Sequence, residues 1–241
     1  MLLDNQNQPN FGQRANRNNS VFTNDDLKMH SSGYDFAQND GNFISLLIID
    51  ESGSMGSIRK AVVDSYNDLV ISILKDAKEI PDLLQHMNVY TFEGHQIIER
   101  LPLTTVRENS INQQLNYIPK GNTPLYDAIG ISITKLEQQI IESNVPAEKF
   151  KVSVAIFTDG LENASIHFKL QEIQQLVNRL KSVGWEFSYY GTEHEVENIA
   201  SLLEMNRFER FDKSTKGFKS SMENYSSNSK LSKAEFVKKF K

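Results

Sequence analysis

The chain contains no cysteine, and this absence removes several classes of site. Without thiols there can be no disulfide framework, no cysteine-ligated zinc cluster and no thiol nucleophile. Residues 1–20 lack the apolar core of a secretory signal peptide, and no stretch of the sequence approaches the length of a membrane span. These absences predict a soluble cytoplasmic protein with no membrane contact.

Basic charge is also scarce over most of the sequence. The 241 residues have a net charge of −5, yet residues 213–241 alone contain eight Lys against two Glu. The preceding residues therefore carry a net charge of −11, which argues against a nucleic-acid-binding domain. The Lys-rich end is typical of a solvated tail, and docking to an acidic partner is the alternative.

Aliphatic residues are few in residues 1–40, which contain eight Asn and four Gln. Such a composition cannot bury enough apolar surface to offset the entropy lost on ordering. We therefore expect a flexible extension over residues 1–40, a folded domain over 41–228 and a Lys-rich tail over 229–241.

The folded domain alternates between two kinds of apolar pattern. Continuous apolar runs at 43–49 and 152–158 are typical of strands that are buried on both faces of a parallel sheet. Further strands are expected at 87–92, 96–103, 185–190 and 207–211, the first two forming a hairpin. Helical spacing predicts helices at 57–80, 123–142, 165–183, 195–204 and 216–225, with Thr123 and Ser165 as N-caps.

This alternation predicts an α/β fold, with a doubly wound, mostly parallel sheet covered by helices on both faces. The hairpin strand is expected to run antiparallel at one edge.

Oxygen-bearing side chains follow the first buried strand directly. Asp50, Ser52 and Ser54 stand at positions 1, 3 and 5 of the turn after residues 43–49. Ligands of open α/β sheets bind at the carboxyl ends of the strands. A carboxylate and two hydroxyls at this place suit a hard cation such as Mg²⁺.

The segment Asp50-Glu51-Ser52-Gly53-Ser54 resembles the DxSxS motif of von Willebrand factor A domains, which opens their metal-ion-dependent adhesion site. The family adds a Thr and an Asp from later loops, and Thr123 and Asp159 match them in order and position. The resemblance implies a six-stranded sheet and the metal ligands Asp50, Ser52, Ser54, Thr123 and Asp159. It is nearest to the intracellular members from bacteria and phages.

The resemblance implies a protein–protein interaction module, an adaptor without catalysis, in which the bound cation ligates an Asp or Glu of a partner protein. Mg²⁺ is the expected ion, with Mn²⁺ and Ca²⁺ as alternatives. A helix starting at Thr123 would also direct free N–H groups toward an anion. We expect Glu51 to face solvent and Asp127 to support the site without binding metal.

Two other functions remain open. A strand ending in Asp also occurs in Mg²⁺-dependent phosphatases, but their chemistry needs a second acid at position 52, which is Ser, and a Lys that no motif supplies. The other alternative is a scaffold with the same fold and a non-functional metal site. The sequence names neither the partner nor the oligomeric state.

Overall fold

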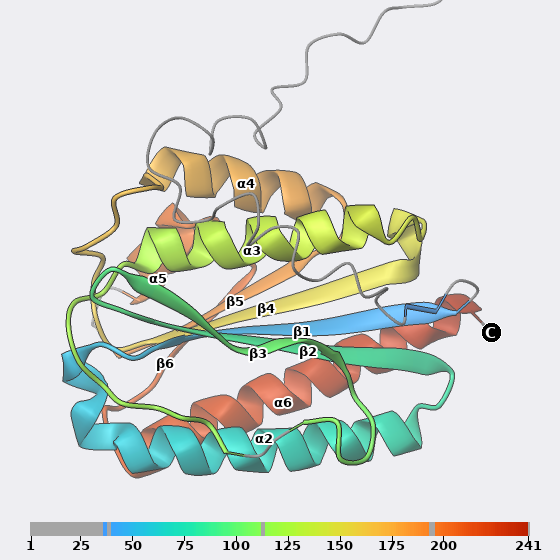
Figure 1. The fold of residues 1–241 in the computed structure, drawn as a ribbon, viewed down its shortest axis with the longest axis horizontal. Helices are drawn as coiled ribbons and strands as arrows, with labels where there is room; N and C mark the ends of the chain where they lie inside the picture. Colours follow the sequence, from blue (N-terminus) through green and yellow to red (C-terminus); the bar gives the residue numbers. More distant parts are fainter. Residues whose placement is uncertain (1–35, 38–39, 112–113, 193–195, 241) are drawn as a thin grey trace, which may run out of the picture. The chain divides into compact units, whose positions relative to one another are not determined.

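The computed structural model describes residues 36–37, 40–111, 114–192 and 196–240, so the extension expected at 1–40 lies almost wholly outside the described residues. One six-stranded sheet organises this part of the chain, in the order β3-β2-β1-β4-β5-β6 (Figure 1). Its strands are β1 (Gly41–Asp50), β2 (Leu83–Glu93), β3 (Gln96–Thr105), β4 (Phe150–Thr158), β5 (Glu186–Gly191) and β6 (Arg207–Arg210).

The most deeply buried strand lies in the middle of the sheet. The central strand β1 is buried along its whole length and pairs in parallel with both β2 and β4. Strand β3 is antiparallel to β2 at one edge, whereas β5 and β6 continue the parallel pairing to the other edge. The predicted mostly parallel sheet with one antiparallel edge strand is therefore confirmed.

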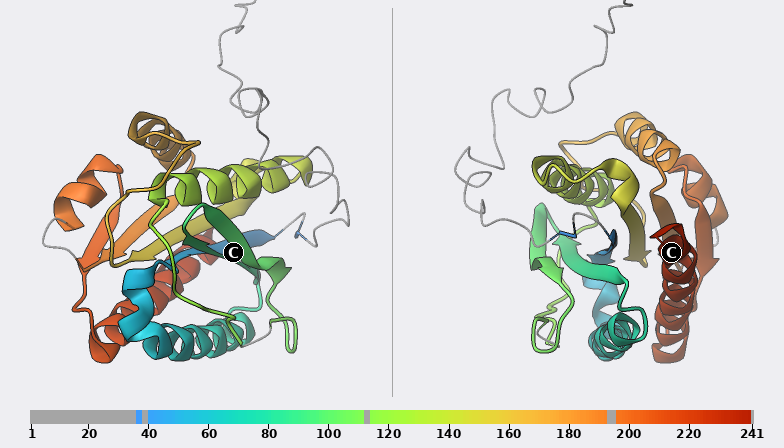
Figure 2. Two further views of the ribbon diagram at one scale, coloured as in Figure 1. Left: turned by 60° about the vertical axis from the view of Figure 1, so that its left-hand side comes forward. Right: turned by 90° about the vertical axis from the view of Figure 1, so that its right-hand side faces the viewer.

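Helices cover both faces of the sheet. Helices α2 and α6 lie side by side on one face, and α3, α4 and α5 lie on the other (Figures 1 and 2). The helices are α2 (Arg59–Glu79), α3 (Leu125–Glu142), α4 (Leu170–Ser182), α5 (Val196–Leu202) and α6 (Thr215–Val237), with short 3-10 turns η2 (Gly53–Ile58), η3 (Ala147–Lys149) and η4 (Lys238–Phe240).

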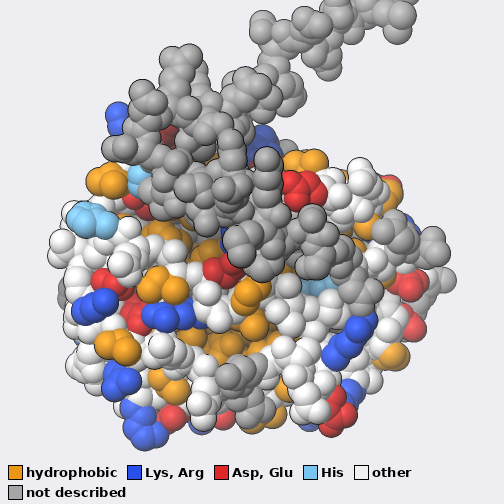
Figure 3. Space-filling view, in the orientation of Figure 1, with side chains coloured by type: hydrophobic (Ala, Val, Ile, Leu, Met, Phe, Trp, Pro, Cys, Tyr) orange, Lys and Arg blue, Asp and Glu red, His pale blue; other side chains and the backbone are white. Residues whose placement is uncertain are grey.

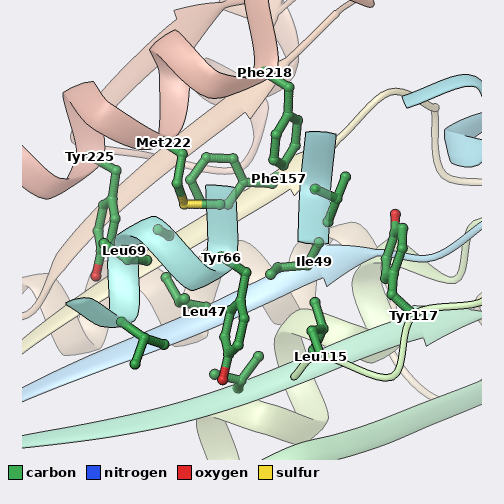
Figure 4. Packing of buried hydrophobic residues seen from close by; sticks show 14 of the residues in the cluster. Leu47, Ile49, Tyr66, Leu69, Leu115, Tyr117, Phe157, Phe218, Met222 and Tyr225 are labelled. Atoms are coloured by element: carbon green, nitrogen blue, oxygen red, sulfur yellow. The ribbon is translucent and has the colours of Figure 1, made fainter. Parts of the chain in front are cut away.

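The core beneath β1 fixes the two helices on their face of the sheet. Figure 4 shows Leu47 and Ile49 of β1 next to side chains of α2 and α6. The ring of Phe157 in β4 stacks on Tyr190 in β5, with 4.5 Å between the ring centroids. Burying each such side chain stabilises the fold by about 1.5–3 kcal/mol, so this layer holds the strand ends in place.

Helix α6 is longer than the predicted helix at 216–225. It continues to Val237 through the segment that the sequence predicts as the start of a solvated Lys-rich tail. The reason is packing, because Phe236 and Val237 are buried in a small cluster with Phe43 and Leu83. Single apolar residues in a run of Lys and Ser give little periodic signal, so the sequence does not show this contact.

The start of α4 also differs from its prediction. The helix begins at Leu170, and the backbone N–H of Lys169 donates to the Glu172 carboxylate at 2.9 Å. The hydroxyl of Ser165, predicted as its N-cap, instead accepts the backbone N–H of Asp127 at 3.0 Å. Ser165 thus serves the neighbouring helix α3.

The surface mixes charges of both signs. On the face shown in Figure 3, Lys and Arg side chains are interspersed with Asp and Glu around a group of apolar side chains. Within the described ranges, no helix is long and apolar enough to cross a membrane.

Candidate functional site

The predicted site residues lie in three segments: the end of β1 with its following turn, the residue after β4, and the loop before α3. Asp50 ends β1, Asp159 directly follows β4, and Thr123 lies two residues before α3. Since β1 and β4 are adjacent and parallel, their carboxyl ends bring Asp50 and Asp159 to the same edge of the sheet. Apart from Ser54, which is exposed, the predicted site residues are buried, so Ser54 marks the side that opens to solvent.

Hydrogen bonds join four of the five predicted residues. The Ser54 hydroxyl donates to Asp159 Oδ1 at 2.5 Å and lies 3.0 Å from the Ser52 hydroxyl. The backbone N–H of Ser52 donates to Asp50 Oδ1 at 2.7 Å, and Thr158 Oγ1 donates to Asp50 Oδ2 at 2.6 Å. A hydroxyl that gives its proton to a carboxylate keeps its lone pairs free, so this arrangement presents oxygen donors to a cation.

Thr123 reaches the same place across Gly160. A Cβ atom at position 160 would lie 3.0 Å from Thr123 Oγ1 and 3.8 Å from Asp50 Oδ2. The missing side chain of Gly160 therefore keeps the space between these two oxygens open. Thr123 was predicted as the N-cap of α3, but Pro124 takes that position without a side-chain cap, which leaves the Thr123 hydroxyl for the site.

The expectation that α3 offers free N–H groups to an anion is wrong. Residues of the loop after β4 take the amides around its start: Asn163 Oδ1 accepts Thr123 N–H, and Glu162 Oε2 accepts Tyr126 N–H, each at 2.9 Å. The Ser165 hydroxyl accepts the N–H of Asp127. The amides at the start of α3 therefore already have hydrogen-bond acceptors within the protein. These three amides are thus not available to an outside anion.

Asp127 supports this loop, as expected. Its Oδ1 accepts the backbone N–H groups of His167 and Phe168, and its Oδ2 accepts that of Ile166, at 2.7–2.9 Å. A carboxylate that already accepts three backbone N–H groups has little capacity left for a metal.

Glu51 was expected to face solvent, and this expectation is wrong. The residue is 1% exposed, and its carboxylate pairs with Arg100 NH2 at 2.6 Å and accepts the backbone N–H of Ile118. Its carbonyl accepts Lys120 N–H at 2.9 Å, so Glu51 holds the segment that leads to Thr123. The sequence gives no sign of this role, because Arg100 lies on β3, 49 residues away.

We expect Arg100→Lys to lower the free energy of unfolding by about 1 kcal/mol, because Lys keeps the charge but cannot make both hydrogen bonds of the guanidinium. Arg100 Nε donates to Thr91 Oγ1 at 2.8 Å while NH2 binds Glu51. Urea unfolding of both proteins measures the difference. A Lys variant as stable as wild type would show that the second hydrogen bond contributes nothing.

Electrostatics at Asp50 favour a positive partner. Burial raises the pKa of its carboxyl from 3.8 to about 6, although hydrogen bonds from Thr158 and Ser52 lower it; the Asp159 charge raises it further. Holding Asp50 ionised at neutral pH therefore costs free energy that a bound cation would recover.

Lys213, which the sequence reading did not single out, also reaches the site. Its Nζ lies 2.5 Å from Asp159 Oδ2. The residue follows β6 by three positions, so its place at the carboxyl end of a parallel strand was a usable signal.

The donor set fits a hard divalent ion. In the part of the chain that the structure describes, no three His, Asp or Glu residues form a metal-binding group, so the site depends on two carboxylates and three hydroxyls. Asp159 Oδ2 is buried, and its close polar partner in the described part of the chain is the Lys213 ammonium at 2.5 Å. A buried carboxylate oxygen that already attracts a cationic group, beside hydroxyl oxygens and an open space, suits an oxygen-ligated cation.

Comparison with known proteins identifies the fold. No family model and no curated protein matches the sequence. Among solved structures, the pilus adhesin SpaC from Lactobacillus rhamnosus GG is 15% identical with a TM-score of 0.58, over 80% of this chain and 31% of that chain. The SpRpn10 VWA domain is 13% identical with a TM-score of 0.50, over 75% and 93% of the two chains.

A minor pilin, the D319A mutant of PilB from Streptococcus sanguinis, is 13% identical with a TM-score of 0.53 over 81% of this chain and 63% of that chain. The chain thus spans about a third of the adhesin and less than two thirds of the pilin. The similarity establishes the fold, which is that of a von Willebrand factor A-like domain, as predicted.

Proposed function

We propose that the protein is a binding module that holds a divalent cation with Asp50, Ser52, Ser54, Thr123 and Asp159 and uses it to bind a carboxylate of a partner protein. The observation that carries the proposal is the convergence of these side chains. Ser52, Ser54 and Asp159 are joined by hydrogen bonds, and Thr123 faces Asp50 across Gly160.

The charge of the donor set explains why a carboxylate would be the ligand. Two carboxylates balance a divalent ion, and the remaining donors are neutral hydroxyls. When bound, the ion would supply an electrophilic position, and Ser54 is the exposed member of the set that would hold it. An Asp or Glu side chain of a partner is the hard, anionic donor that such a position prefers. Mg²⁺ is the expected ion, with Mn²⁺ and Ca²⁺ as alternatives.

The same site supports binding better than hydrolysis. Phosphatase chemistry of the alternative kind needs a carboxylic acid at position 52, where Ser52 contacts Ser54. An adhesin and a VWA domain are among the proteins of this fold, which agrees with an interaction role. The absence of catalysis, the cytoplasmic location and the bacterial or phage origin stay predictions.

Mn²⁺ offers a direct test, because its effect on water-proton relaxation reports bound, exchangeable water. We expect the purified protein to enhance relaxation with Mn²⁺, and a short peptide containing a single Glu to reduce the enhancement. The same peptide with Gln in place of Glu is the matched control. Binding of Mn²⁺ without any difference between the two peptides would reject the carboxylate part of the proposal.

Thr123→Val tests the metal part, since Val keeps the shape of Thr and removes only the hydroxyl. We expect the dissociation constant for Mn²⁺ to rise by at least the roughly tenfold that losing an outer-shell partner costs. The control is Thr104→Val, whose hydroxyl donates to the nearby Pro102 carbonyl on β3. Equal Mn²⁺ affinity in the Thr123 variant and wild type would remove Thr123 from the site.

A further inference from the structure

Lys213 places a positive charge inside the candidate metal centre. Its Nζ lies 2.5 Å from Asp159 Oδ2, and the Asp159 side chain has no exposed surface. The other oxygen of that carboxylate accepts the Ser54 hydroxyl. The ammonium is thus the close polar contact of Oδ2, and Asp159 is also a predicted metal ligand.

The backbone around Lys213 is held by hydrogen bonds and close packing, whereas its side chain is partly exposed. Ser214 caps α6 by accepting Gly217 N–H at 3.0 Å, and its own N–H donates to the Asp212 carbonyl at 2.6 Å. Gly217 packs so closely on Asp212 that a Cβ there would lie 2.2 Å from the Asp212 carbonyl oxygen. The Lys213 side chain is 37% exposed. Its ammonium can therefore leave Asp159 by rotamer changes alone, without movement of α6.

The position of Asp159 is fixed independently of this lysine. Thr192 Oγ1 donates to the Asp159 carbonyl at 3.1 Å, and Ser54 holds the carboxylate from the other side. The carboxylate therefore stays in place when the ammonium leaves. The same oxygen is then available to either cation.

We propose that Lys213 is a tethered competitor of the divalent cation at this site. This inference rests on the proposed function. An ammonium and a divalent ion on one buried carboxylate oxygen repel each other strongly, because the surroundings screen their charges less than bulk water does. The ion therefore binds only as the Lys213 side chain leaves Asp159, and the lysine raises the ion concentration that the site needs. In the metal-free protein the same ammonium neutralises Asp159.

Titration calorimetry with Mn²⁺ tests the competition in wild type, Lys213→Met and Lys216→Met. Met keeps the apolar stem of Lys and removes the charge. Lys216 lies in the first turn of α6 and is exposed, so its variant controls for the overall loss of one positive charge. We expect Lys213→Met to bind Mn²⁺ about tenfold more tightly than wild type, a gain of about 1.4 kcal/mol, and Lys216→Met to bind as wild type does. Equal affinity in all three proteins would overturn the competition and leave the proposed function standing.

A double-mutant cycle in EDTA tests the ion pair without metal. Lys213→Met should lower the unfolding midpoint of the wild-type background and have no effect in an Asp159→Asn background. Additive effects would overturn the inference, because the two charges would then not interact. If neither wild type nor Lys213→Met binds Mn²⁺ while the cycle shows coupling, both proposals fail, and Lys213 is a permanent counter-ion of Asp159. Binding by the Lys213→Met variant alone would support the competition in its strongest form.

Discussion

Replacing Asp50 with Asn should stabilise the metal-free protein and at the same time abolish its stabilisation by divalent cations. Burial raises the pKa of Asp50 from 3.8 to about 6, so the ionised carboxylate destabilises the native state at neutral pH. A pKa difference of this size corresponds to a destabilisation of the native state by about 3 kcal/mol. The Asn variant does not carry this penalty, because Asn cannot ionise. The Asn oxygen can still accept the Ser52 N–H that Asp50 Oδ1 accepts.

The pH dependence of this gain has a definite sign. A carboxyl whose pKa is raised by folding destabilises the native state fully above its folded-state pKa, and the penalty disappears as the pH falls toward 3.8. The advantage of Asp50→Asn in EDTA should therefore fall to about half between pH 7.5 and pH 5.

Urea unfolding in EDTA and in saturating Mg²⁺ or Mn²⁺ measures both effects. Wild type should gain about 2.7 kcal/mol with an ion at a hundred times its dissociation constant, and Asp50→Asn should gain nothing. Asp64→Asn, which removes an exposed carboxylate in α2, should respond to the ion as wild type does. An Asn variant that is less stable than wild type in EDTA would contradict the electrostatic cost assigned to Asp50.

Asp76→Ala should cause the largest loss of stability, about 3–5 kcal/mol, because it leaves a buried ammonium without its counter-charge. Asp76 in α2 pairs with Lys233 of α6 at 3.0 Å, and the two side chains are 3% and 1% exposed. Lys230 also approaches the second oxygen of Asp76, at 3.3 Å. One carboxylate therefore serves two lysines of the neighbouring helix.

Replacing the lysine of this pair should cost much less stability than replacing the aspartate. Burial lowers the pKa of Lys233, which shows that its charge is costly in this position. Lys233→Met removes that charge and leaves Asp76 paired with Lys230, so we expect a loss of only about 1 kcal/mol. Asp68→Ala is the matched control, since it breaks an exposed α2–α6 pair with Lys219 and should cost 1 kcal/mol or less. Equal losses for Asp76→Ala and Asp68→Ala would contradict the prediction.

The fold was predictable because its central strands are buried on both faces. Strands β1 and β4 have no exposed position, so their sequences are almost continuous apolar runs that no surface helix shows. The helices on either side carry a periodic apolar face that alternates with these runs along the chain. The oxygen donors after β1 and β4 were equally visible, because parallel strands bring their carboxyl ends together.

What the sequence did not show depends on contacts between distant residues. Glu51 is buried because Arg100 comes from another strand to pair with it, and a local pattern cannot report that. The end of α6 follows from apolar side chains that pack on Phe43 of β1. The contact of Lys213 with Asp159 depends on the conformation of the lysine side chain, although the sequence shows that Lys213 follows β6.

The loop after β4 bears on how fast the proposed site could bind and release an ion. Glu162 accepts the N–H groups of Ala164 and Ser165, and Asp127 accepts those of the following three residues. The loop is therefore preorganised by bonds that do not involve the site oxygens, so an arriving ion meets a scaffold that is already ordered. Under the proposed function, loading and unloading of the ion would need only water exchange and side-chain rotation, which occur far faster than the refolding of a loop. Such a module would bind and release its ion quickly when the surrounding ion concentration changes.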